Sequence, residues 1–199
     1  MEGLNNYSDE LFLKALGDFI KAMRVAAGYP TIRSFVDTVD MSYSQYQGYE
    51  SGKNITIKKL KEILNYFGLT PKDWLKIDLE NTEFPLNMAV ERLEYMRIKQ
   101  VMSQVEVLKG REESLSLKTI EIERFIKILI ACHEPKTRSF ILKDIVKMED
   151  SHNTFKRVAG KLLDYGWLDF VDKESKNSPE QAYYTTVEGK NLLKQCIEE

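Results

Sequence analysis

The chain has 199 residues, of which 43% are hydrophobic and 30% charged, and its formal net charge at pH 7 is -2. This composition is typical of a globular protein and excludes the low-complexity and Gly/Ser-rich classes. Acidic and basic residues nearly balance along the whole chain. The balance argues against a protein that coats nucleic acid indiscriminately, because such proteins are basic.

The sequence carries no signal for export, membrane insertion or metal binding. No apolar run reaches the ~18 residues that a membrane span requires, and the N-terminus lacks the basic and apolar segments of a signal peptide. Cys132 and Cys196 lie far apart and have no CxxC spacing, which predicts reduced thiols instead of a disulfide or a zinc site. We therefore expect a cytoplasmic protein with no cofactor, no metal and no membrane contact.

Residues 1–80 show the pattern of a compact all-α domain. Apolar residues recur at helical spacing, and Thr31 and Ser42 are placed to cap the second and third helices. Gly68 closes the fourth helix, and the fifth is expected to bury Trp74 and Leu75. The predicted helices cover residues 10–27, 31–39, 43–50, 56–67 and 70–75.

Residues 81–114 are predicted to connect two domains. Residues 81–85 have the composition of a joint, and a single helical pattern then runs over 86–109 without a strict heptad repeat. A helix of this length leaves an apolar stripe that needs a partner surface, and this predicts a homodimer through the helix. The competing interpretation is that the helix packs against its own domains. The stripe comprises Leu86, Val90, Leu93, Val101, Val105 and Leu108.

Residues 115–199 have the element order of a winged helix. Helices are predicted at 119–132, 139–148, 151–165 and 187–197, and strands at 167–172 and 182–186. The strands flank a polar loop, 173–181, which would form a two-stranded wing. Thr185 and Glu188 are placed to cap the last helix. The complete chain is therefore expected to be mainly α, with a small β wing.

Residues 12–75 carry a recognisable helix-turn-helix pattern. Arg24 and Gly28 end the first helix, Phe35-Val36 stand where the second and third helices cross, and Glu50-Ser51-Gly52 follow the third. With the ladder Ile57, Leu60, Ile63 and Leu64, this stretch resembles the Cro/repressor (XRE) family. A departure is Ile32, which stands where the family usually has Gln, so that a common phosphate contact is either missing or supplied by Arg33.

The resemblance implies that the third helix enters the major groove of DNA. Gln45 can bond an adenine edge, and Ser44 can serve either base. The residues expected to contact DNA here are Arg33, Tyr43, Ser44, Gln45, Gln47, Lys53 and Asn54. The alternative for this domain is a helical module that binds a protein.

The C-terminal region carries the residues of a second recognisable pattern. Leu162-Leu163-Asp164-Tyr165-Gly166-Trp167-Leu168 and Tyr183-Tyr184-Thr185-Thr186-Val187-Glu188-Gly189 resemble winged-helix regulators of the MarR kind. The resemblance implies that residues 151–165 form a recognition helix with a local cluster of cations. The residues expected to contact DNA are Asn153, Thr154, Lys156, Arg157 and Lys161, with Lys176 on the wing. The alternative is that this domain serves in dimerisation.

No sequence motif of a known catalytic site is present, so we expect the protein not to be an enzyme. The leading hypothesis is a sequence-specific DNA-binding transcription regulator, of the repressor type, that binds double-stranded DNA as a homodimer. The alternative is a protein-interaction or scaffold module that uses the same folds to bind a partner. Nothing in the sequence identifies a small-molecule effector.

Overall fold

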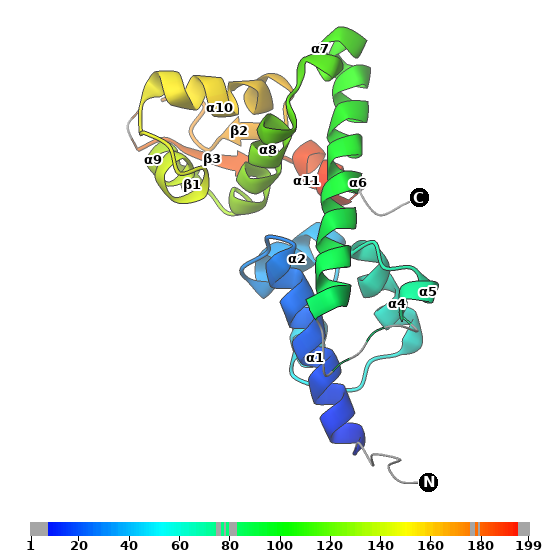
Figure 1. The fold of residues 1–199 in the computed structure, drawn as a ribbon. Helices are drawn as coiled ribbons and strands as arrows, with labels where there is room; N and C mark the ends of the chain where they lie inside the picture. The colour runs from blue at the N-terminus through cyan, green and yellow to red at the C-terminus, as the bar shows by residue number, and fades with distance from the viewer. Residues whose placement is uncertain are drawn as a thin grey trace. The chain divides into compact units, whose positions relative to one another are not determined.

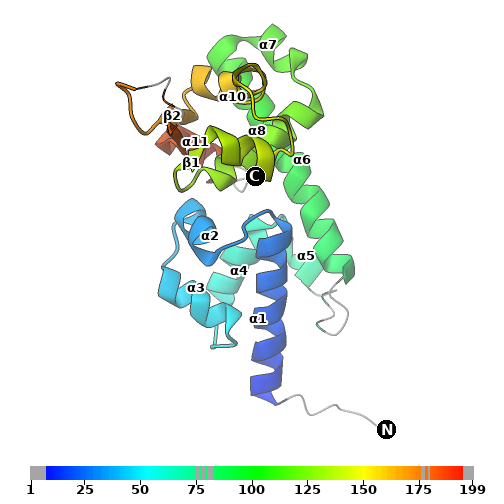
Figure 2. The same ribbon diagram turned by 90° about the vertical axis from the view of Figure 1, so that its left-hand side faces the viewer.

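A computed structural model describes residues 8–74, 77, 79, 83–175, 178 and 180–194. The protein is mainly helical and has a small antiparallel sheet of three strands (Figures 1 and 2). The chain divides into two compact units, residues 1–93 (unit 1) and 94–199 (unit 2). Among the described residues, no helix combines the length and apolar character needed to cross a bilayer.

The helices of unit 1 follow the sequence pattern closely. Thr31 caps the second helix, since its hydroxyl accepts a hydrogen bond from the backbone N–H of Ser34 at 3.1 Å. Ser42 occupies the N-cap position of the third helix, but its hydroxyl contacts that of Ser44 and caps no backbone group. Leu75 lies outside the described residues. The helices before the long helix are α1 Asp9–Ala26, α2 Ile32–Val39, α3 Tyr43–Glu50, α4 Ile57–Tyr66 and α5 Pro71–Trp74.

Aromatic rings form the centre of the unit 1 core. Phe35 on α2 packs edge-on against Tyr29 and Tyr66 and lies parallel to Phe67, with ring centroids 5.0 to 5.5 Å apart. Tyr46 of α3 tilts against the same ring at 4.7 Å. All five rings are almost completely buried. Aromatic pairs at these separations add to the stability that burial alone provides, and here they join α2, α3 and α4.

A buried ion pair joins α1 to the end of α3. Arg24 Nε and Nη2 donate to the two carboxylate oxygens of Glu50 at 2.6 and 3.2 Å, and Arg24 Nη1 donates to the carbonyl of Tyr29 at 2.6 Å. Both side chains are almost completely buried. Two charges at this depth are tolerated because each satisfies the other through several hydrogen bonds.

Gly17 lets the backbones of α1 and α3 approach closely. A Cβ atom at this position would lie 2.6 Å from the carbonyl oxygen of Tyr49 and 2.9 Å from that of Glu50. Both distances are shorter than any real carbon–oxygen contact, so a larger residue would push the helices apart. The close approach is what brings Glu50 within reach of Arg24.

The long helix α6, Glu83–Lys109, begins inside the predicted joint. Residues 83–85 were expected to form a joint but are helical. Pro85 is tolerated in the helix because it lies in the first turn, where backbone N–H groups have no acceptor within the helix. Leu93, Val101 and Val105 are buried within the chain, whereas Leu108 is 48% exposed. The expectation that all six apolar residues of the helix need a partner molecule is therefore wrong for the three buried ones.

A short helix follows α6 in a stretch for which no helix was predicted. Gly110 has a positive φ of 92° and reverses the chain, after which α7 covers Arg111–Ser116. Gly110 alone therefore separates α6 from α7. This stretch is rich in polar residues, and it can still form one short helix because Arg and Glu are good helix formers.

Unit 2 contains a sheet with strand order β1-β3-β2. The strands are β1 Lys136–Thr137, β2 Leu168–Phe170 and β3 Ala182–Thr185, all antiparallel. The prediction of two strands missed β1, because two residues are too few to show an alternating pattern. Helices α8 Thr119–Ala131, α10 His152–Asp164 and α11 Val187–Lys194 contact this sheet (Figure 1).

Two local features of unit 2 differ from the predictions. The helix expected at 139–148 is instead the short helix α9 Arg138–Phe140 followed by a π-helix, η1 Ile141–Ile145. The cap of α11 is Thr186, whose hydroxyl accepts from the N–H of Gly189 at 3.1 Å. Thr185, the predicted cap, is buried and donates to the carbonyl of Leu129 at 2.7 Å.

We expect Glu50→Gln to lower the free energy of unfolding of unit 1 by about 3 kcal/mol, because it leaves the buried Arg24 guanidinium without a counter-charge. Urea titration followed by circular dichroism measures the loss. Asp18→Asn is the matched control, since it breaks the exposed Lys14–Asp18 pair and should change stability by less than ~0.5 kcal/mol. Equal stability of the two variants would contradict the role assigned to the buried pair.

Candidate nucleic-acid interface

The outer side of α3 is polar, exposed and uncharged. Tyr43, Ser44, Gln45 and Gln47 are all exposed, as the sequence predicted for a recognition surface. Their groups can donate and accept hydrogen bonds, and Tyr43 adds an aromatic ring that is 41% exposed. Helices α2 and α3 lie side by side (Figure 2).

The inner side of α3 fixes the orientation of the outer one. Tyr46 and Glu50 point into the core, one among the aromatic rings and the other against Arg24. Burial, and after it the negative charge of Glu50, raises the pKa of the Tyr46 hydroxyl, so it stays protonated. A helix held at both of these residues cannot rotate, and its polar side must therefore face outward.

Two predicted phosphate contacts flank α3. Arg33 on α2 is exposed, and its guanidinium lies 3.5 Å from the carboxylate of Asp37 on the same helix. Lys53 and Asn54 are exposed just beyond the end of α3. The Lys53 cation has no carboxylate partner within the described part of the chain.

Gly48 has a role that the sequence did not reveal. Its missing side chain leaves room for Lys53, whose Cδ would lie 3.0 Å from a Cβ placed on Gly48. The Lys53 backbone N–H also donates to the carbonyl of Gly48 at 2.9 Å. Glycine inside a helix is unfavourable by up to ~1 kcal/mol relative to alanine, so its presence here needs a structural reason. What it accommodates is the aliphatic stem of Lys53, which places the cation beside α3.

In unit 2, the exposed side of α10 carries part of the predicted cluster. Asn153, Lys156 and Arg157 are exposed, as expected. Thr154 is half-buried. Its backbone N–H donates to the hydroxyl of Ser151 at 3.1 Å, and this hydroxyl donates to that of Thr154 at 2.9 Å. Thr154 therefore belongs to the helix cap, and its contact with DNA stays a prediction.

Lys161 forms an ion pair within unit 2. Its Nζ lies 3.0 Å from Oε1 of Glu113 on α7, and the same oxygen accepts from the Tyr165 hydroxyl at 2.8 Å. Lys161 first, and Tyr165 after it, lower the pKa of Glu113, so the carboxylate stays charged and holds the lysine. The sequence shows no sign of this pair, because Glu113 lies 48 positions before Lys161, and the contact of Lys161 with DNA stays a prediction.

The described part of the loop between β2 and β3 contains one lysine, and this lysine forms an ion pair. Lys173 is paired with Asp169 at 2.8 Å, and Lys176 lies outside the described residues. Gln181 is buried and closes the loop, since its side-chain oxygen accepts from the N–H of Asp172 at 3.2 Å. Within its described part, this loop is held by its own hydrogen bonds.

The described residues form no cluster of His, Cys, Asp and Glu that could bind a metal. Cys132 is buried, and burial raises the pKa of its thiol to about 12, so it is a neutral core residue.

Two candidate surfaces follow from the residues described above. They are the polar side of α3 in unit 1 and the cationic side of α10 in unit 2.

Comparison with protein-family models, with curated proteins and with solved structures finds no match to this chain. What the two surfaces can bind must therefore follow from their own residues. Hydrogen-bonding groups without charge on one helix, with cations on neighbouring segments, are chemically suited to base edges and phosphates respectively.

Proposed function

We propose that this protein is a sequence-specific DNA-binding transcription regulator that acts as a dimer. In this proposal α2 and α3 form a helix-turn-helix with α3 as the recognition helix. Helices α8 to α10, with the strands β2 and β3, form a winged helix. The observation that carries the proposal is the division of α3 into a core-anchored side and an exposed, uncharged, hydrogen-bonding side.

This division is what base recognition requires. An α-helix fits the major groove of B-DNA, and a rigidly held helix can place its side chains against base edges repeatably. Gln45 and Gln47 can each donate and accept at once, as an adenine edge requires. Lys53 and Arg33 can supply the positive charge that binds phosphate and sets the register.

The second unit adds a smaller set of phosphate contacts. Lys156 and Arg157 are exposed on α10 and have no carboxylate partner among the described residues. Lys161 is paired with Glu113 and is left out of this set. The proposed contacts in unit 2 are therefore Asn153, Lys156 and Arg157.

A second candidate function is a protein-interaction module. The compensation of Lys161 by Glu113 and of Lys173 by Asp169 favours it for unit 2, because these pairs reduce the charge available for phosphate. A partner protein would bind without a steep dependence on salt, whereas DNA binding weakens steeply as salt rises.

We expect Gln45→Ala and Lys53→Ala to weaken DNA binding in different ways. Selection from a random duplex library defines the preferred site, and fluorescence anisotropy then measures affinity for that site and for random DNA. Gln45→Ala should lose about 1–3 kcal/mol on the preferred site only and relax one base position, because it removes a base contact. Lys53→Ala should weaken both DNAs alike.

Lys21→Ala, which removes an exposed charge from α1, is the control and should leave both affinities unchanged. Equal losses on preferred and random DNA for Gln45→Ala would remove this residue from the base-reading set. Selection that enriches no sequence at all would count against the proposed function.

The salt dependence of binding tests the contribution of α10. We expect Lys156→Ala/Arg157→Ala to reduce the slope of log affinity against log salt by roughly two units, one for each cation that no longer reaches a phosphate. The control Lys118→Ala/Lys127→Ala removes two exposed cations from unit 2 outside α10 and should leave the slope unchanged. An identical slope in all three proteins would leave DNA binding to unit 1 alone.

The dimer is tested through the exposed apolar residues of α6. Val107 is 77% and Leu108 48% exposed, so Val107→Asp/Leu108→Asp should give a folded monomer in sedimentation equilibrium. Leu93→Asp/Val101→Asp is the contrasting variant. It should unfold the chain instead, because both residues are buried inside it. A dimer that survives the Val107/Leu108 change would place the interface elsewhere.

A further inference from the structure

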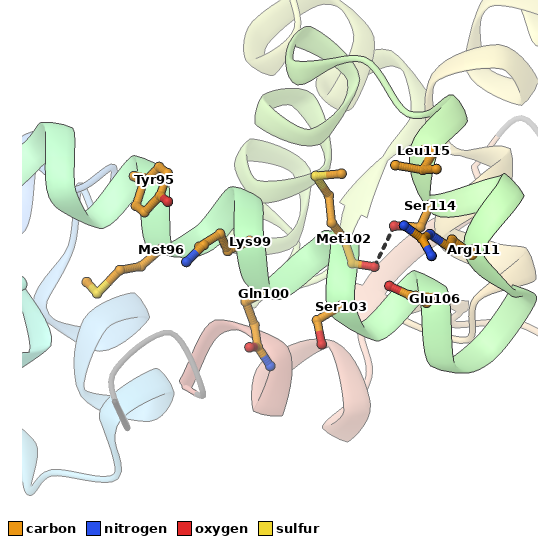
Figure 3. Close-up of a pocket in the computed structure, with 10 residues that line it drawn as sticks. All are labelled: Tyr95, Met96, Lys99, Gln100, Met102, Ser103, Glu106, Arg111, Ser114 and Leu115. Carbon is orange, nitrogen blue, oxygen red and sulfur yellow. Dashed lines mark hydrogen bonds between the residues drawn. The ribbon is translucent and has the colours of Figure 1, made fainter.

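A groove in unit 2 lies between the exposed side of α6 and the short helix α7. It encloses about 660 Å³, within the ~300–1,000 Å³ that small-molecule sites typically offer. Figure 3 shows the side chains that line it. They are Tyr95, Met96, Lys99, Gln100, Met102, Ser103 and Glu106 from α6, with Arg111, Ser114 and Leu115 from α7.

The groove has a fixed wall. Gly110 turns the chain back, and Ser114 is buried and donates from its hydroxyl to the carbonyl of Met102 at 2.8 Å (Figure 3). This bond joins the middle of α7 to α6. The space between the helices is therefore present before any molecule enters it, which lowers the ordering required for binding.

The side chains that line the groove carry one excess positive charge. Lys99 and Arg111 contribute two cations against the single carboxylate of Glu106. Among the described residues neither cation forms an ion pair, and the Lys99 ammonium lies 5.0 Å from the centre of the Tyr95 ring. A groove with this balance attracts one negative charge.

The groove also has an apolar part, formed by four of its lining side chains. Tyr95 is 60% and Leu115 65% exposed, and both face the same groove as Met96 and Met102. Covering apolar surface is favourable by about 25 cal/mol per Å². The flexible thioethers of methionine adapt to apolar bodies of different shape.

We propose that this groove binds a small amphipathic anion: one carboxylate, sulfonate or phosphate head on an apolar body. Lys99 and Arg111 hold the head, and Tyr95, Met102 and Leu115 cover the body. The groove volume and its single excess charge fit a molecule of this size better than a second protein chain. The proposal stands independently of DNA binding, because it uses residues of α6 and α7 alone.

The test uses the full chain with methionine labelled by ¹³C at its methyl groups, and decanoate as the probe, below its micelle-forming concentration. The methyl signals of Met96 and Met102 should shift in a saturable way, while those of Met23 and Met148, which do not line the groove, should stay in place. The alcohol 1-decanol has the same chain without charge and should bind about tenfold more weakly.

The variant Lys99→Ala/Arg111→Ala should bind decanoate about tenfold more weakly and lose the preference for decanoate over decanol. Lys118→Ala/Lys127→Ala, with two other exposed cations of unit 2 removed, should keep both. Equal affinity for the two probes in the unmodified chain would overturn the proposal. So would shifts at all the methionines together, or a change of oligomeric state in the Lys99/Arg111 variant without any shift by decanoate.

Discussion

The arrangement of unit 1 depends on the buried ion pair between Arg24 and Glu50. This pair joins the end of α1 to the end of α3, and the third hydrogen bond of Arg24 adds the loop at Tyr29. Removing two charges from water is strongly unfavourable, and only their mutual satisfaction compensates for it. The helices must therefore meet in one rotational position. The aromatic rings around Phe35 then fill the space that this position leaves.

The sequence was sufficient to predict the helices of unit 1. It was not sufficient to predict the contacts that hold these helices together. Helix α3 has its predicted bounds, and α2 begins one residue later than predicted, because Thr31 is its N-cap. The partner of Arg24 lies 26 residues along the chain, and no local pattern points to it. No local pattern reveals the role of Gly17 either, because this role depends on the backbone of α3 that Gly17 contacts.

In unit 2 the sequence predicted most helices and both longer strands, yet overestimated the free charge. Lys161 was expected to be available because its neighbours on α10 are exposed, and a helical pattern says nothing about an acid on another helix. The two-residue strand β1 and the short helix α7 were missed for a related reason. Both are too short to show a period, and they form because longer elements already provide a surface for them.

The separation of α3 into a buried and an exposed side affects which substitutions the protein can accept during evolution. Tyr46 and Glu50 are part of the core of unit 1, whereas Ser44, Gln45 and Gln47 are exposed and contribute nothing to it. Substitutions at exposed positions of this kind usually change stability by less than ~0.5 kcal/mol. The codons for these exposed residues could thus drift through many combinations while the protein keeps folding. Related chains with one architecture could acquire separate binding preferences through single substitutions, with no compensating change elsewhere.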